Sequence, residues 1–103
     1  MVGLISDLLI RISGIRWSLV MGRDNSQLIF SLRTNRWNQN AGRMAQRVAK
    51  GLGTAGGHGM AAGGQIPTSG LSLKKEQVIR ETLAGRLLRF LGYEKAREEK
   101  LLR

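Results

Sequence analysis

The sequence predicts an α+β fold, with a small mixed β-sheet, packed helices and a long C-terminal helical extension. Three observations predict it. Residues 15–33 alternate apolar and polar side chains with the period of a strand, residues 41–52 repeat apolar side chains with the period of a helix, and residues 73–91 form a longer helical stripe. At 103 residues and 42% hydrophobic content, the chain has the size of one domain with a single modest core.

The first twelve residues are expected to form an amphipathic helix, because apolar side chains recur there at helical spacing. These side chains are Val2, Leu4, Ile5, Leu8, Leu9 and Ile12. Ser13 and Gly14 end the segment, and residues 1–14 are interpreted as a linker or packing helix. The segment contains Asp7 and lacks a basic start, so we do not interpret it as a signal peptide. No segment has the length and apolarity of a membrane span, so we expect a cytoplasmic protein without a membrane partner.

Residues 15–33 predict an antiparallel hairpin. One face of its two strands is apolar and consists of Ile15, Trp17, Leu19, Met21, Leu28, Phe30 and Leu32. Residues 22–25 have the composition of a turn. Arg33 is then expected at the end of the second strand, on its more polar face. Trp37 follows in a polar loop and is expected to close over the edge of the core; the alternative is that it stacks on a nucleic-acid base beside Arg36.

Two further helices are expected. Asn40 can cap the first, whose narrow face of small side chains suits close packing on a sheet. That face consists of Ala41, Met44, Ala45, Val48, Ala49 and Leu52, and Gly51 and Gly53 end the helix. Residues 64–67 are expected to enter a third strand. Ser72 can cap the second helix, whose apolar stripe is Val78, Ile79, Leu83, Leu87, Phe90 and Leu91, and residues 93–103 return to helical character.

The stretch from Gly53 to Gly64 has the most unusual composition and contains the single histidine, His58. Eight of the fourteen glycines fall between Gly51 and Gly70, which is too many for an ordinary turn. A flexible linker would be polar and rich in Gly and Ser, whereas this stretch carries Met and Ala. Glycine allows positive φ and close approach of a ligand to the backbone. Free backbone N–H groups in such a loop can form an anion-binding nest.

The charge distribution predicts a polyanionic partner. The net charge is +10, and no acidic residue occurs between Asp24 and Glu76. That window contains Arg33, Arg36, Arg43, Arg47, Lys50, Lys74 and Lys75. Nucleic acid or a phosphorylated small molecule would suit such a surface; the alternative is a solvated basic surface. With one histidine and no cysteine, the chain has too few ligands for a metal site of its own and forms no disulfide.

Arg33 and His58 are the candidate phosphate ligands. A guanidinium offers a bidentate fork to a phosphate, and an imidazole can donate a hydrogen bond whether neutral or charged. A lone histidine is more often structural, but His58 lies between glycines, where the neighbouring sequence supplies no core packing. We therefore expect both side chains to contact one phosphate.

Residues 56–63, Gly-Gly-His-Gly-Met-Ala-Ala-Gly, resemble the Gly-Gly-His-x-x-Ala-Ala-Gly signature of the DHH-associated domain, subfamily one. Residues 30–34 resemble the strand that ends in Ser-Leu-Arg-Ser in that family, with Thr34 in place of the last Ser. The helix from Asn40 lies between the two motifs, as it does there. Ala55 stands where many members have another glycine. The resemblance covers about residues 17–66, so we divide the chain into this domain at 15–70 and a helical extension at 71–103.

This family is the C-terminal substrate-binding domain of DHH phosphoesterases, such as oligoribonucleases and nucleotide bisphosphate phosphatases. The resemblance implies that the domain holds a phosphate or nucleotide through the glycine–histidine loop and the strand arginine. It presents the substrate to Mn or Mg in a separate DHH catalytic domain. The implied substrate-binding residues are Arg33, Thr34, Gly56, Gly57, His58, Ala61, Ala62 and Gly63.

The chain itself has two Asp and one His, too few for the metal site of a DHH domain. We therefore assign it no catalytic residue, metal ligand or cofactor, and expect a hydrolase as the parent protein. The alternative function is a stand-alone, non-catalytic nucleic-acid-binding module. A homodimer is left open.

Overall fold

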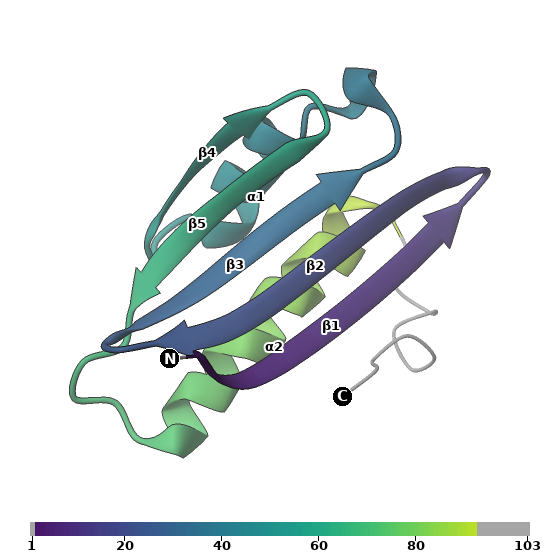
Figure 1. Ribbon diagram of the computed structural model, residues 1–103. Helices are drawn as coiled ribbons and strands as arrows, with labels where there is room; N and C mark the ends of the chain where they lie inside the picture. Colours follow the sequence, from purple (N-terminus) through teal and green to yellow (C-terminus); the bar gives the residue numbers. More distant parts are fainter. Residues whose placement is uncertain (1, 93–103) are drawn as a thin grey trace.

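The structure, a computed structural model, describes residues 2–92, with side chains from residue 7 onward, and has the predicted α+β class (Figure 1). Its strands are β1 (Val2–Ile12), β2 (Ile15–Asp24), β3 (Gln27–Thr34), β4 (Thr54–His58) and β5 (Ala61–Pro67). They form one sheet in the order β1-β2-β3-β5-β4. All four strand pairs are antiparallel, where a mixed sheet was expected.

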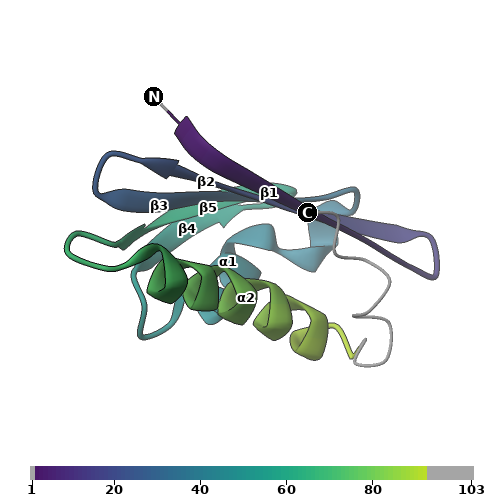
Figure 2. The same ribbon diagram turned by 90° about the horizontal axis from the view of Figure 1, so that it is seen from below.

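Two α-helices cover one face of the sheet and leave the other face open (Figure 2). They are α1 (Ala41–Ala49) and α2 (Leu73–Phe90), and a short 3₁₀ turn, η1 (Trp37–Gln39), precedes α1. The helical character expected for residues 93–103 lies outside the described residues. Neither α-helix within residues 2–92 combines the length and the apolarity that crossing a bilayer requires.

The prediction of an N-terminal helix is wrong, because residues 2–12 form the edge strand β1. β1 pairs with β2 as far as Ile12, which lies opposite Ile15, so Ser13 and Gly14 form a two-residue turn. Both turn residues have positive φ, 50° and 81°, as a hairpin turn of type I′ requires. A continuous apolar run fits the period of a helix or a strand, and here pairing with the long strand β2 decides between them.

The predicted hairpin of residues 15–33 and the helix after Asn40 are confirmed. Asp24 pairs with Gln27 across a two-residue turn, and the apolar face of the hairpin is buried except at the half-buried Ile15. The side chain of Asn40 caps α1 by accepting a hydrogen bond of 3.1 Å from the backbone N–H of Arg43. The small side chains of α1 enter the same core as the sheet. The sheet face and the helix face therefore form one hydrophobic layer.

The second predicted helix is also confirmed, including its cap. The Ser72 hydroxyl accepts a hydrogen bond of 3.2 Å from the backbone N–H of Lys75. The helix contributes Leu83, Ala84, Leu87 and Leu88 to the common core, so this part of the predicted extension packs with the sheet and α1. Val78, expected in the apolar stripe, is 55% exposed.

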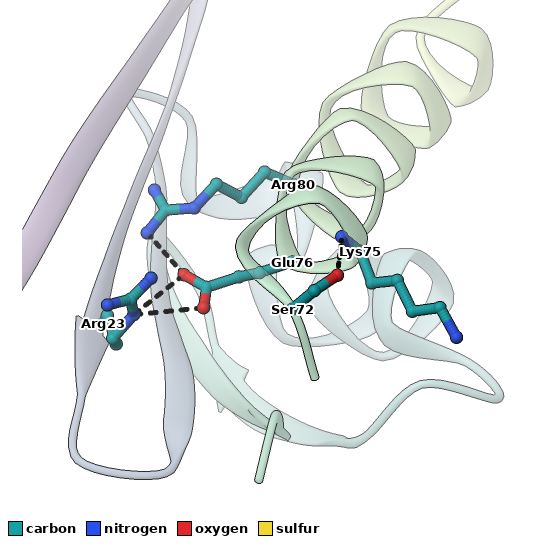
Figure 3. Close-up of polar contacts among 5 residues, drawn as sticks. All are labelled: Arg23, Ser72, Lys75, Glu76 and Arg80. Atoms are coloured by element: carbon teal, nitrogen blue, oxygen red, sulfur yellow. Dashed lines mark hydrogen bonds and ion pairs between the residues drawn. The ribbon is translucent and has the colours of Figure 1, made fainter. Parts of the chain in front are cut away.

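Two charged side chains of α2, Glu76 and Arg80, are buried instead. Glu76 accepts hydrogen bonds from Nε of Arg23 at 3.0 and 3.2 Å, and another of 3.2 Å from Nη2 of Arg80 (Figure 3). Since Arg23 belongs to β2, this ion-pair cluster attaches the first turns of α2 to the sheet. Charge pairing offsets part of the desolvation penalty that burial imposes on these groups.

Other basic side chains of the helices also have structural partners. Nη1 of Arg86 donates hydrogen bonds of 2.8 Å to the carbonyl oxygens of Val48 and Lys50, which caps the C-terminal end of α1. The guanidinium of Arg47 lies 4.1 Å from the centre of the Phe90 ring. Some of the basic side chains of the chain therefore make contacts within the fold rather than standing free on its surface.

Candidate functional site

The glycine-rich stretch forms a β-hairpin rather than an extended loop. β4 and β5 pair from Thr54 opposite Gln65 to His58 opposite Ala61. Only Gly59 and Met60 remain as the turn, and Gly59 has a φ of 64°, which suits the first turn position of a type II′ hairpin. The third strand, expected from Gly64, already begins at Ala61. Successive N–H groups of a strand point in opposite directions, so the hairpin presents a flat surface instead of the converging N–H groups of a nest.

Glycines allow α1 and the core to pack directly on this hairpin. A Cβ added to Gly42, in the first turn of α1, would lie 1.9 Å from the carbonyl oxygen of Gly57. A Cβ added to Gly64 would lie 2.6 Å from the ring of Phe30. Gly42 is not singled out by the sequence alone, although its position beside Ala41 and Ala45 on the helix could have placed it on the packed face.

Arg33 and His58 lie in one row across the sheet. Ala61 of β5 pairs with His58 of β4 on one side and with Arg33 of β3 on the other. Residues paired in this way point to the same face, and this face is the one that the helices leave open. Because adjacent strands are about 4.8 Å apart, the Cα atoms of Arg33 and His58 are separated by roughly 10 Å. Both side chains are long enough to approach one ligand above Ala61.

Neither side chain is engaged elsewhere. Arg33 and His58 are exposed, and among the side chains that the structure describes neither has a hydrogen-bonding or ionic partner. In the next row, Gly56 pairs with Gly63. A Cβ added to Gly56 would meet nothing within 4 Å, so the surface beside the two side chains is open backbone. A ligand can reach this row without displacing an internal contact.

Five of the eight residues implied as substrate-binding share this open face: Arg33, Gly56, His58, Ala61 and Gly63. Thr34, Gly57 and Ala62 belong to the alternate positions and face the helices. Thr34 is buried, and its hydroxyl accepts a hydrogen bond of 3.4 Å from the backbone N–H of Arg36. Ala62 packs against the core. These three residues can support the row but do not line the open face.

The comparison with protein families identifies the family of the chain. Residues 1–87 match the family model of the DHHA1 domain. The chain belongs to the DHHA1 family. This is the DHH-associated domain of DHH phosphoesterases. Searches of curated proteins and of solved structures returned no significant match.

The DHHA1 match is wider than the resemblance over residues 17–66, since it includes β1 and most of α2. The same elements complete the sheet and its core in the structure. The motif strand β3 and the hairpin β4–β5 thus form the half of the DHHA1 sheet that carries Arg33 and His58.

A shallow hollow lies on the open face beside this row. It is lined mainly by apolar atoms of Val20, Gly22, Ile29 and Ser31. Its lining includes Asp24 and no basic side chain, so its chemistry does not suit a phosphate. Among the described residues, no three His, Cys, Asp or Glu side chains gather as metal ligands. The residues described in this DHHA1 domain therefore do not fit a two-metal site.

Proposed function

We propose that this DHHA1 domain binds a phosphate of a nucleotide or short oligonucleotide between Arg33 and His58. The observation that carries the proposal is that both side chains stand on the open face in one cross-strand row and flank Ala61. Neither has a partner among the side chains of residues 7–92. A guanidinium fork and an imidazole N–H supply charge-assisted hydrogen bonds to phosphate oxygens. The flat backbone of Gly56 and Gly63 leaves room for the attached sugar.

On this proposal the domain orients the substrate and does not cleave it. Cleavage belongs to a DHH catalytic domain of the parent protein, with Mn or Mg bound there. The family supports this partner because DHHA1 is the domain associated with DHH phosphoesterases. Within this chain, the work of Arg33 and His58 is to fix the position of the phosphate, and the apolar hollow beside them can receive a less polar part of the ligand.

A double-mutant cycle tests the proposal. The affinity for adenosine monophosphate is measured by calorimetry for the wild type, Arg33→Ala, His58→Ala and the double variant. Each single substitution should weaken binding about tenfold or more, since a hydrogen bond to a charged group contributes about 1.5–3 kcal/mol. Because the two side chains share one phosphate, the double variant should lose less affinity than the sum of the single losses.

Lys74→Ala is the matched control, because it removes an exposed positive charge at the far end of α2. It should leave the affinity within about twofold of the wild type if binding requires the Arg33–His58 row rather than net charge. Additive losses in the cycle, or an equal loss in Lys74→Ala, would contradict a shared phosphate site.

A further inference from the structure

Three connecting segments meet at one end of the sheet (Figure 1). We call this region the loop end and define it as residues 13–16, 33–43 and 58–61. Asn35 joins the first two segments, since its side chain donates to the carbonyl of Gly14 at 3.2 Å and accepts from the N–H of Arg16 at 2.7 Å. The backbone of Thr34 donates to the carbonyl of Met60 at 3.0 Å, which joins the third. The loop end is therefore one fixed surface.

This surface is basic and contains no carboxylate. It carries four exposed arginines, which are Arg16, Arg33, Arg36 and Arg43, together with His58. None of these side chains has a hydrogen-bonding or ionic partner among the side chains that the structure describes. Two of the carboxylates lie at the opposite end of the sheet, since Asp24 pairs with Gln27 beside the β2–β3 turn and Glu76 is bonded to Arg23 of the same end. Positive charge without internal pairing suits a polyanion that runs across the surface.

Trp37 belongs to the same surface and directly follows Arg36. It is 75% exposed, whereas Trp17 in the core is 2% exposed. The expectation that Trp37 closes over the core is therefore wrong, because the turn η1 lies outside the layer formed by the sheet and helices. Four residues of chain span at most about 14 Å, so Trp37 lies within reach of a ligand whose phosphate is held at Arg33. An exposed indole among arginines is the arrangement on which single-stranded bases stack.

We propose that Trp37 stacks on a base of the bound single strand, near the phosphate held by Arg33 and His58, while the loop-end arginines contact its neighbouring phosphates. The inference rests on the proposed function and adds Trp37, which lies outside the matched motifs, as the residue that contacts a base. Bases inside a duplex are already stacked and do not offer a free face to an aromatic side chain. The arginines around Trp37 contact neighbouring phosphates, so the oligonucleotide gains a base contact that a single phosphate does not provide.

The two tryptophans allow a direct experiment. Hexaadenylate, adenosine monophosphate and ribose 5-phosphate are titrated against the wild type, Trp37→Ala, Trp37→Phe and Arg33→Ala, with intrinsic fluorescence and calorimetry as readouts. Hexaadenylate should quench the tryptophan fluorescence of the wild type, in which Trp37 is exposed. In Trp37→Ala, whose remaining emission comes from the buried Trp17, the fluorescence should stay unchanged. Trp37→Ala should weaken hexaadenylate binding about five- to 150-fold, the range for one stacked base, and Trp37→Phe should retain most of the affinity. Ribose 5-phosphate, which offers a phosphate but no base, should bind Trp37→Ala and the wild type equally.

Two further probes complete the test: an abasic ribose-phosphate hexamer, which has the backbone but no bases, and a duplex of matched length. Both should bind the wild type more weakly than the single strand, and neither should distinguish Trp37→Ala from the wild type. Unchanged hexaadenylate affinity in Trp37→Ala would overturn the stacking site, as would a duplex that binds at least as tightly as the single strand. Failure of the proposed function would give a different result. In that case Arg33→Ala would bind adenosine monophosphate as tightly as the wild type.

Discussion

At the scale of single residues, Gly42 decides how closely α1 can approach the hairpin that carries His58. We expect Gly42→Ala to lower the free energy of unfolding by about 1–3 kcal/mol, because its new Cβ would overlap the backbone of Gly57. Gly85→Ala is the control. Gly85 lies inside α2 with nothing within 4 Å of an added Cβ, so the substitution should stabilise the helix by about 0.5–1 kcal/mol. Urea unfolding measures both, and equal midpoints for the two variants would refute the close contact.

Residue chemistry also explains which site predictions could be made without a structure. Arg33 and His58 could be singled out as candidates from their motifs, because a guanidinium at the end of a strand and an imidazole between glycines can both bind phosphate. The division of the motif between two faces could not be predicted in the same way. It depends on the pairing of Ala61 with both His58 and Arg33, and a shift by one residue would turn the row toward the helices. The exposure of Trp37 likewise depends on the path of η1, which leaves the sheet.

At the scale of elements, β1 can be tested against the helix that its composition suggests. In the strand, Ile10 is 3% exposed and Leu9 is 60% exposed. Ile10→Ala should therefore lower the free energy of unfolding by about 2–5 kcal/mol, and Leu9→Ala should change it by less than about 0.5 kcal/mol. An amphipathic helix of residues 1–12 would bury Leu9 and expose Ile10. Thermal or urea unfolding measures both losses, and a larger loss in Leu9→Ala than in Ile10→Ala would contradict the strand.

The elements differ in how far local sequence determines them. The caps Asn40 and Ser72 act on their own helices, and so the starts of α1 and α2 are predictable from neighbouring residues. β1 carries an apolar run that is compatible with either period, and its state is fixed by a partner strand. Glu76 and Arg80 lie on a helix face that composition alone assigns to solvent. Their burial follows from Arg23 on β2, 53 positions before Glu76, which no local pattern contains.

At the scale of the whole molecule, the cluster of Arg23, Glu76 and Arg80 holds α2 against the sheet. Glu76→Ala would remove the buried carboxylate that pairs with both Arg23 and Arg80, and we expect a loss of about 3–5 kcal/mol in the free energy of unfolding. Glu81→Ala, an exposed site on the same helix, is the control and should change stability by less than about 0.5 kcal/mol. Similar unfolding midpoints for the two variants would show that the cluster does not hold the helix.

The distribution of charge over the molecule predicts how salt affects nucleic-acid binding. Arg80 and Arg86 already have partners inside the fold, so we expect the exposed arginines of the loop end to be the ones that contact phosphates. Each phosphate neutralised on a single strand contributes about −0.7 to the slope of log affinity against log salt. If all four loop-end arginines contact phosphates, the slope for hexaadenylate approaches about −2.8.

Single substitutions can show which end of the molecule makes the phosphate contacts that produce this slope. Arg36→Ala should make the slope less steep by about 0.7, because one contact and its counterion release are lost. Lys74→Ala removes the same charge from the opposite end of the domain and should leave the slope unchanged. The slopes are measured by fluorescence titration over a series of salt concentrations, with the Trp37 signal as the readout. A slope near zero, or the same reduction in both variants, would mean that the net charge of the chain, rather than the loop end, attracts the strand.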